Sequence, residues 1–281
     1  MEINVAKSAG FCFGVKRAID IALKTAQAGK NVYMLGDIVH NEEVVSAIEE
    51  AGIHKINHLT NGNNKTLLIR AHGTSLATLK KAAKLGFQIF DATCPMVKEI
   101  HQIAQRMENS GCTVIIIGDK RHDEVRGIAG HLRKKAIIID RYETIPLSRI
   151  RKIKKACVVV QSTQNLDEVL TIVALLKKYI PEVRFFNTIC RPTRQKQEEI
   201  KTMPLKNDVM IVIGSKHSAN TKRLYQIAKS LNARSYWVSA KKDINVRWFA
   251  KARSVGITAG ASTPDNTTQE IIRYLKTLKK H

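Results

Sequence analysis

The stretch Asp91-Ala92-Thr93-Cys94-Pro95 recurs in altered form as Asn187-Thr188-Ile189-Cys190, and a third cysteine, Cys12, follows the opening apolar segment. Cys12 lies 82 residues before Cys94, which lies 96 residues before Cys190. The same two intervals separate three glycines that each follow an apolar run, Gly36, Gly118 and Gly214. The matching intervals predict three copies of one structural unit, each bringing one cysteine to a common place.

Short apolar runs alternate with segments whose apolar residues have helical spacing. The predicted strands are 2–6, 32–35, 66–70, 88–90, 113–117, 136–139, 157–160, 184–186, 208–213, 235–238 and 255–258. The predicted helices are 14–28, 42–51, 76–85, 96–109, a short one ending at 132, 166–178, 193–201, 221–231, a short one near 245–250 and a last one with Pro264 in its first turn. Residues 143–155 are expected to connect the strand 136–139 to the strand 157–160.

This alternation predicts an α/β fold of parallel sheets with flanking helices. We expect three units related by pseudo-threefold symmetry, each a small parallel sheet. The expected boundaries are 13–94, 95–190, and 191–281 together with 1–12. In such sheets ligands bind beyond the carboxyl ends of the strands, where the cysteine loops are expected to lie.

The composition is that of a globular protein, with 281 residues, 44% hydrophobic and 25% charged. No apolar run approaches the roughly 18–20 residues that span a bilayer, so no membrane association is expected. The N-terminus lacks the basic and apolar regions of a signal peptide, which predicts a cytoplasmic protein. The net charge of +23 favours acidic partners, although solvated helix faces also account for it. A nucleic-acid partner is not expected.

The five cysteines fall into two classes. Cys112 and Cys157 begin β-branched runs and are predicted to be small core residues. Cys12, Cys94 and Cys190 lie in loop-like sequence. Three thiolates fall short of the four ligands of a structural zinc site, whereas they suit an iron–sulfur cluster with one iron that lacks a protein ligand. Such a cluster is expected at the centre of the three units.

Histidine, serine and asparagine side chains gather in the loops that follow the predicted strands. The set comprises His40, His72, His122, Ser162, Ser218, Asn220 and Ser262. Polar donors at strand ends and helix N-termini favour a bound phosphate, because free N–H groups and the helix dipole attract an anion there. Neither a P-loop nor a Gly-x-Gly-x-x-Gly motif is present.

Glu124 follows His122 by two residues and begins a predicted helix. In a closed and partly desolvated pocket, its pKa would rise enough for it to donate protons. Taken alone, Glu124 would be an exposed carboxylate at a helix start.

Several motifs together resemble the 4-hydroxy-3-methylbut-2-enyl diphosphate reductase family, also called LytB-type. They are Gly10-Phe11-Cys12-Phe13-Gly14-Val15, Val39-His40-Asn41, Ala71-His72-Gly73, Asp91-Ala92-Thr93-Cys94-Pro95, Gly214-Ser215-Lys216 with Asn220-Thr221 and Arg223-Leu224, and Thr258-Ala259-Gly260-Ala261-Ser262 with Pro264-Asp265. The motifs occur in order over essentially the whole chain.

The resemblance implies reductive removal of an allylic hydroxyl, the last step of the non-mevalonate isoprenoid pathway. It implies one 4Fe-4S cluster per chain, with Cys12, Cys94 and Cys190 as ligands and one open iron. It also implies that Glu124 supplies protons, that Ser162 lies near the substrate hydroxyl, and that the histidines, Ser218, Asn220 and Ser262 bind the diphosphate. Ferredoxin or flavodoxin is the implied electron donor, and the enzyme is expected to be monomeric or weakly dimeric.

Four positions depart from the family pattern. Asp123 stands where proline is common, and its charge would raise the pKa of Glu124. Ser162 replaces a usual threonine, Ala219 a frequent serine, and Lys196 a usual arginine. These changes affect the expected affinity and pH optimum but not the reaction type.

Two other functions remain open from the sequence. A hydro-lyase would use the same open iron without net electron transfer, and redox-neutral turnover would reveal it. A basic protein that binds RNA or acidic surfaces would keep the fold without activity, and its binding would weaken steeply with salt.

Overall fold

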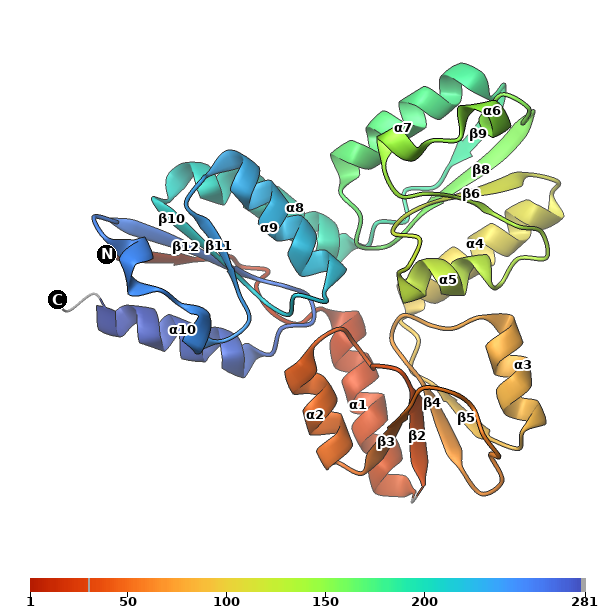
Figure 1. Ribbon diagram of the computed structural model, residues 1–281, viewed down its shortest axis with the longest axis horizontal. Helices are drawn as coiled ribbons and strands as arrows, with labels where there is room; N and C mark the ends of the chain where they lie inside the picture. The colour runs from red at the N-terminus through yellow and green to blue at the C-terminus, as the bar shows by residue number, and fades with distance from the viewer. Residues whose placement is uncertain (30, 279–281) are drawn as a thin grey trace. The chain divides into compact units, whose positions relative to one another are not determined.

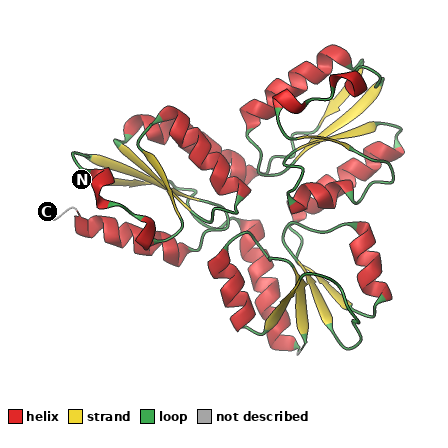
Figure 2. Ribbon diagram, in the orientation of Figure 1, coloured by secondary structure: helices red, strands yellow, loops and turns green. Residues whose placement is uncertain are grey.

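The computed structural model describes residues 1–29 and 31–278. Within these residues, twelve strands form three four-stranded sheets, and every strand pair is parallel. Helices flank each sheet (Figures 1 and 2). The predicted α/β class, with three small parallel sheets, is therefore confirmed.

One sheet is built from residues 32–91. Its strands are β2 (Val32–Leu35), β3 (Ile53–Ile56), β4 (Thr66–Ile69) and β5 (Gln88–Asp91), in the order β3-β2-β4-β5. Its helices are α1 (Phe13–Ala28), α2 (Glu42–Glu50) and α3 (Leu76–Lys84). In Figure 1, α1 and α2 cover one side of this sheet and α3 the other.

A second sheet is built from residues 113–185. Its strands are β6 (Thr113–Ile117), β7 (Ile137–Ile139), β8 (Lys155–Val160) and β9 (Glu182–Phe185), in the order β7-β6-β8-β9. Its helices are α4 (Pro95–Asn109), α5 (Asp123–Ala129), α6 (Leu147–Ile150) and α7 (Leu166–Tyr179), with the 3₁₀ helix η1 (Tyr142–Thr144).

The third sheet joins the two ends of the chain. Its strands are β1 (Glu2–Val5), β10 (Val209–Ile213), β11 (Ser235–Val238) and β12 (Ser254–Ala259), in the order β1-β12-β10-β11. The helices are α8 (Arg191–Lys206), α9 (Ala219–Leu231) and α10 (Asp265–Thr277), with the 3₁₀ helices η2 (Lys241–Asp243) and η3 (Val246–Phe249).

The three sheets repeat one strand order. In each, the first strand of the unit (β2, β6 or β10) pairs with both the second and the third, and the third pairs with the fourth. The fourth strands are β5, β9 and β1, and each leads into one of the loops that carry Cys94, Cys190 and Cys12. The sequence intervals between the cysteines therefore reflect a repeated topology. The exact domain boundaries remain a prediction.

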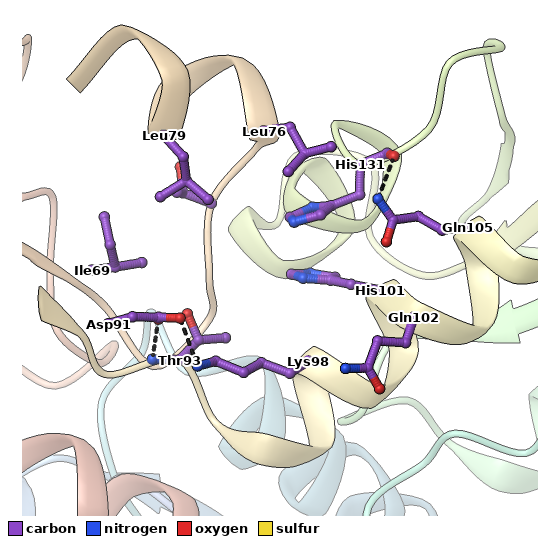
Figure 3. Close-up of a pocket in the computed structure, with 11 residues that line it drawn as sticks. Ile69, Leu76, Leu79, Asp91, Thr93, Lys98, His101, Gln102, Gln105 and His131 are labelled. Carbon is purple, nitrogen blue, oxygen red and sulfur yellow. Dashed lines mark hydrogen bonds and ion pairs between the residues drawn. The ribbon is translucent and has the colours of Figure 1, made fainter. Parts of the chain in front are cut away.

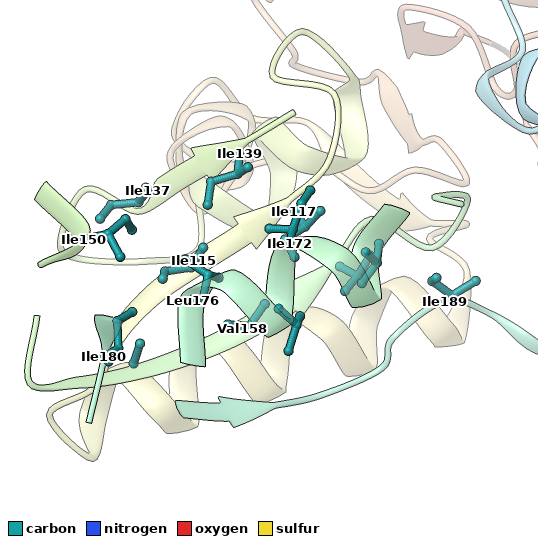
Figure 4. Packing of buried hydrophobic residues seen from close by; sticks show 14 residues of the cluster. Ile115, Ile117, Ile137, Ile139, Ile150, Val158, Ile172, Leu176, Ile180 and Ile189 are labelled. Atoms are coloured by element: carbon teal, nitrogen blue, oxygen red, sulfur yellow. The ribbon is translucent and has the colours of Figure 1, made fainter. Parts of the chain in front are cut away.

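Alternate residues of the second sheet pack into two separate cores, because successive side chains of a strand point to opposite faces. Ile115, Ile117 and Val158 face α7, where Ile172 and Leu176 meet them (Figure 4). The opposite face is covered by α4 and α5 and includes both Cys112 and Cys157. Each fully buried aliphatic side chain contributes about 1.5–3 kcal/mol by leaving water.

The chain divides into two compact units. The first comprises Met1–Lys16, Val39–Ser46 and the residues from Arg191 onward, and the second comprises Arg17–Ile38 and Ala47–Cys190. The first unit holds the third sheet, and the second unit holds the other two.

Most predicted elements are present, but four predictions need correction. The strand β3 was not predicted, and the predicted connection 143–155 includes α6. The helix α8 runs from Arg191 to Lys206 rather than from 193 to 201, and Pro204 lies inside its last turn. Pro264 is the N-cap of α10 rather than part of its first turn. None of the helices in the described part of the chain has the length and apolar character needed to cross a membrane.

Candidate active site

The recurring motif around Cys94 is a turn held by its own first side chain. Asp91 ends β5, and its carboxylate accepts the backbone N–H of Thr93 (2.9 Å). Lys98, one turn into α4, pairs with the same carboxylate (2.6 Å). An acceptor that bonds the backbone two residues ahead turns the chain sharply, which here carries it from the strand into Cys94, the N-cap of α4.

The altered copy of the motif makes the same turn. The side-chain oxygen of Asn187 accepts the backbone N–H of Ile189 (3.3 Å), and Cys190 directly precedes α8. Asp and Asn at the third position before each cysteine therefore perform one function. Both residues belong to the recurring stretch, but the sequence alone did not predict their turn-forming function. The sequence signal for this function is an Asp or Asn three residues before a cysteine, at the end of a strand.

Each of the three loop cysteines donates its backbone N–H to a carbonyl just beyond the third strand of its unit. The pairs are Cys12 with Ala261 (3.0 Å), Cys94 with Ala71 (2.9 Å) and Cys190 with Ser162 (3.1 Å). The fold thus fixes every loop cysteine beside a polar loop that was predicted to bind substrate.

Burial separates the two classes of cysteine. Cys12, Cys94 and Cys190 are partly exposed, and each directly precedes a helix. The Val15 N–H donates to the Cys12 sulfur (3.5 Å). Cys112 and Cys157 are buried core residues, as predicted, and burial raises the pKa of the Cys157 thiol to about 12. No described cysteine forms a disulfide.

His72 and His122 lie together in the second unit. Their rings meet edge to face, with centroids 5.2 Å apart. Gly73 adopts a φ of +73°, which favours glycine, so that the chain turns immediately after His72. His122 is the N-cap of α5, where its Nδ1 accepts the Glu124 N–H (3.2 Å). That bond places the ring proton of a neutral His122 on Nε2.

Glu124 is 1% exposed and is held at both carboxylate oxygens by Ser162. The Ser162 N–H donates to Oε1 (2.6 Å) and the Ser162 hydroxyl donates to Oε2 (2.8 Å). Burial raises the pKa of Glu124 from 4.5 to about 7, while the two hydrogen bonds act to lower it. A carboxyl of this kind exchanges a proton near neutral pH.

These contacts join the predicted residues of the second unit into one network. Ala71 accepts from Cys94 and is followed by His72, whose ring meets His122. His122 accepts from Glu124, which is bound by Ser162, and Ser162 accepts from Cys190. Two loop cysteines and the candidate acid are thus connected through successive short contacts.

The expected influence of Asp123 on Glu124 is not found. Asp123 forms an ion pair with Arg70 (2.7 Å), and both side chains are about one-fifth exposed, at 22% and 18%. The pKa of Glu124 is raised by burial, and its hydrogen bonds come from Ser162. Arg70 neutralises the extra carboxylate, a pairing across 53 residues of sequence.

The first unit contains a matching polar group around the loop after β12. Asn220, in the first turn of α9, accepts the Ala261 N–H on Oδ1 (3.0 Å). Its Nδ2 is buried and makes no hydrogen bond within the described residues. Ser218 is the N-cap of α9 and accepts the Thr221 N–H (3.2 Å).

Ser262 and His40 also come together in this unit, where the Ser262 hydroxyl donates to the His40 carbonyl (3.4 Å). Ala219 occupies the first helical position of α9, where a backbone N–H has no partner within the helix. The buried Nδ2 of Asn220 and the backbone N–H groups at the start of α9 together provide hydrogen-bond donors suited to an anion.

A separate pocket of about 280 Å³ lies in the second unit (Figure 3). His101 and His131 stack against each other there, with ring centroids 3.9 Å apart. Burial lowers the pKa of His101 to about 3, so its ring is neutral at physiological pH. The sequence did not predict this pair, because neither histidine lies in a strand-end loop.

Known proteins resemble this chain over its whole length. The sequence profile of the family described as LytB protein matches residues 3–276. The 4-hydroxy-3-methylbut-2-enyl diphosphate reductase of Geobacter metallireducens is 37% identical over 276 residues, covering 98% of this chain and 97% of the relative. The reductase of the same name from Campylobacter jejuni (strain 81-176) is 39% identical, covering 99% of each.

Two solved structures are also similar. One is (E)-4-hydroxy-3-methyl-but-2-enyl diphosphate reductase, described as the terminal enzyme of the non-mevalonate pathway, with a TM-score of 0.73, 35% identity and coverage of 99% of this chain and 100% of that one. The other is the Plasmodium falciparum E-1-hydroxy-2-methyl-but-2-enyl-4-diphosphate reductase, with a TM-score of 0.90, 28% identity and coverage of 98% and 88%. The chain belongs to the LytB protein family.

Proposed function

We propose that this chain is a 4-hydroxy-3-methylbut-2-enyl diphosphate reductase. The substrate's allylic C–O bond breaks, two electrons and two protons are taken up, and isopentenyl or dimethylallyl diphosphate leaves together with water. Family membership and the full-length relatives support this assignment. The single observation that carries it is the network that joins Cys94, Glu124 and Cys190 through His72, His122 and Ser162.

We propose that Cys12, Cys94 and Cys190 hold one 4Fe-4S cluster. Thiolates are the usual cluster ligands, and these three are the partly exposed cysteines, each before a helix and each tied by its backbone to a strand-end loop. Cys112 and Cys157 are buried away from those loops. A cluster held by these three cysteines would supply electrons and an open iron that could act as a Lewis acid.

The diphosphate would be bound by His40, His72, His122, Ser218, Asn220 and Ser262. The best supported of these is Asn220, because its buried Nδ2 needs an acceptor that the described residues do not provide. A diphosphate oxygen would satisfy it at the start of α9, where the helix dipole also favours negative charge.

Glu124 is proposed as the proton source. A departing hydroxide is a poor leaving group, so it must leave as water, and a carboxyl with a pKa of about 7 keeps its proton in a large part of the molecules at neutral pH. Ser162 holds both oxygens of Glu124 and so orients the acid. We also propose that the Ser162 hydroxyl lies near the substrate hydroxyl.

The electrons must come from another protein, since no motif for a second redox cofactor is present in the sequence. We propose ferredoxin or flavodoxin, whose acidic surfaces complement the net charge of +23. We also propose a cytoplasmic location, where the loop thiols stay reduced.

The test is an anaerobic assay of cluster-reconstituted protein with a reduced viologen dye and the hydroxymethylbutenyl diphosphate, with iron and sulfide counted on the same sample. We expect substrate-dependent dye oxidation that is lost in Cys94→Ser and kept in the matched control Cys112→Ala. A fully loaded wild-type protein that leaves the dye reduced would contradict the assignment. Conversion of substrate without dye oxidation would favour a hydro-lyase.

A further inference from the structure

Lys196 is the largest side chain in the described chain that is almost completely buried, at 1% exposure. It lies in the second turn of α8, the helix that begins directly after Cys190. Its Nζ donates to the carbonyls of Ser8, Gly10 (3.0 Å) and Ala259 (3.1 Å). An ammonium group has three N–H donors, so three carbonyl oxygens match its capacity.

Glu199 lies one turn further along α8 and contacts the same loop. Its Oε2 accepts both the backbone N–H (3.1 Å) and the hydroxyl (2.7 Å) of Ser8. The carbonyls of Ser8 and Gly10 thus accept from a cation, and the N–H of Ser8 donates to a carboxylate. We call Lys196 and Glu199 together the α8 clamp.

The loop held by the α8 clamp is the one that carries Cys12. The loops before Cys94 and Cys190 are turned by Asp91 and Asn187, but the corresponding position before Cys12 is Ala9, which has no side-chain acceptor. Gly10 has a φ of +92°, a backbone conformation that favours glycine, so the chain bends sharply two residues before Cys12. Lys196, which lies in α8, holds this loop from outside. Asp91 and Asn187 hold the other two loops from within.

We propose that the α8 clamp positions Cys12. It replaces the side-chain-to-backbone turn that Asp91 and Asn187 form before the other two cysteines and that this unit lacks. Lys196 links three segments in the first unit: α8, the loop before Cys12, and the end of β12, which leads to Ala261 and Ser262. Because Ala261 accepts the Cys12 N–H, the clamp acts on both sides of that bond. The function of the clamp rests on the proposed assignment of Cys12 as a cluster ligand.

The full-length chain without iron gives the first test, by hydrogen exchange of the segment 8–14 and by alkylation of the cysteines followed by mass spectrometry. Lys196→Met removes the cation, so we expect the Cys12 alkylation rate to rise at least about tenfold relative to Cys94 in the same molecules. Backbone hydrogen exchange should be faster than in wild type in segment 8–14 but unchanged in β10. Lys196→Arg should restore much of the wild-type ratio, because it keeps a buried donor and charge.

Lys201→Met is the matched control, since Lys201 is exposed on the same helix. If Lys196→Met fails to fold, Glu199→Ala replaces it, because Glu199 is partly exposed and its loss leaves Ser8 access to water. The proposal is overturned if the Cys12-to-Cys94 ratio stays at the wild-type value, or if all loop cysteines accelerate equally.

Iron retention gives the second test. After anaerobic reconstitution, Lys196→Met should lose iron to a chelator at least about tenfold faster than wild type and Lys201→Met. Equal loss rates in all three would contradict the positioning function. Wild-type protein that takes up no iron would count against the proposed cluster, while the alkylation ratio would still decide whether the clamp holds the loop.

Discussion

Ser162 bonds both oxygens of the Glu124 carboxylate, through its backbone N–H at 2.6 Å and its hydroxyl at 2.8 Å. One residue therefore fixes the orientation of the buried acid and opposes the rise in its pKa that burial causes. The balance between these two effects keeps the pKa of Glu124 close to neutrality.

Glu124→Gln should reduce turnover at least about 10²-fold, because the amide cannot donate a proton as a carboxylic acid does. Substrate binding should persist, since the glutamine fills the same volume. Single-turnover kinetics and a direct binding measurement separate the two effects. Glu168→Gln is the matched control, an exposed glutamate in the first turn of α7. Turnover near the wild-type rate in Glu124→Gln would remove this residue from the reaction.

Ser162→Ala should move the pH profile toward higher pH. The lost hydroxyl donor stabilises the ionised carboxylate, so its removal raises the pKa of Glu124 by about one unit. Since the protonated form is needed, the rate falls as pH rises through this pKa, and the midpoint of the fall should shift upward. The quantity to measure is the pH at the midpoint of the fall in rate, not the maximal rate. Ser162→Thr, which keeps a hydroxyl, should leave the midpoint near its wild-type position.

Asp123→Asn should leave that midpoint unchanged, because Arg70 already neutralises Asp123. The stability lost with this partly exposed ion pair should be about 1 kcal/mol or less, measured by chemical unfolding. Asp123→Pro should behave alike in the pH profile, since proline suits the first position of α5. A midpoint displaced to lower pH would show instead that the Asp123 charge raises the pKa of Glu124.

His101→Phe should make the protein more resistant to acid. The pKa of His101 is lowered from 6.5 to about 3, so the unfolded chain binds a proton in this range that the folded chain does not. The contribution of neutral His101 to the free energy of unfolding is fully present above pH 6.5. It declines by about 1.4 kcal/mol per pH unit as the pH falls toward 3. Unfolding curves between pH 7 and 4 should show a smaller decline for His101→Phe. The exposed His58→Phe serves as control, and parallel curves for wild type and His101→Phe would refute the expectation.

Local patterns predicted the fold well, because apolar runs and helix spacing are properties of neighbouring residues. The strand β3 was missed since its middle residues, His54 and Lys55, are polar and exposed, which leaves no apolar run to detect. The strand-end loops and their cysteines were found through the repeat, which is visible in the sequence itself.

Contacts between distant residues could not be predicted in the same way. Lys196 has the sequence context of an exposed helical lysine, yet it is buried and bonds the loop before Cys12 and the end of β12, which lie far from it in the sequence. Likewise, Asp123 was expected to act on its neighbour Glu124, whereas its partner Arg70 is 53 residues away. The residue types of the site were predictable, but their electrostatic partners depended on the tertiary fold.

The recurring bond from each loop cysteine to a strand-end carbonyl leaves the side chain of the acceptor residue unconstrained. The acceptors are Ala71, Ser162 and Ala261, and the bond uses only their backbone oxygens. Substitution at these positions can therefore proceed without disturbing the attachment of the cysteines. The side chain at each position is therefore available for a separate task, and in one unit the Ser162 hydroxyl bonds Glu124 while its backbone oxygen holds Cys190.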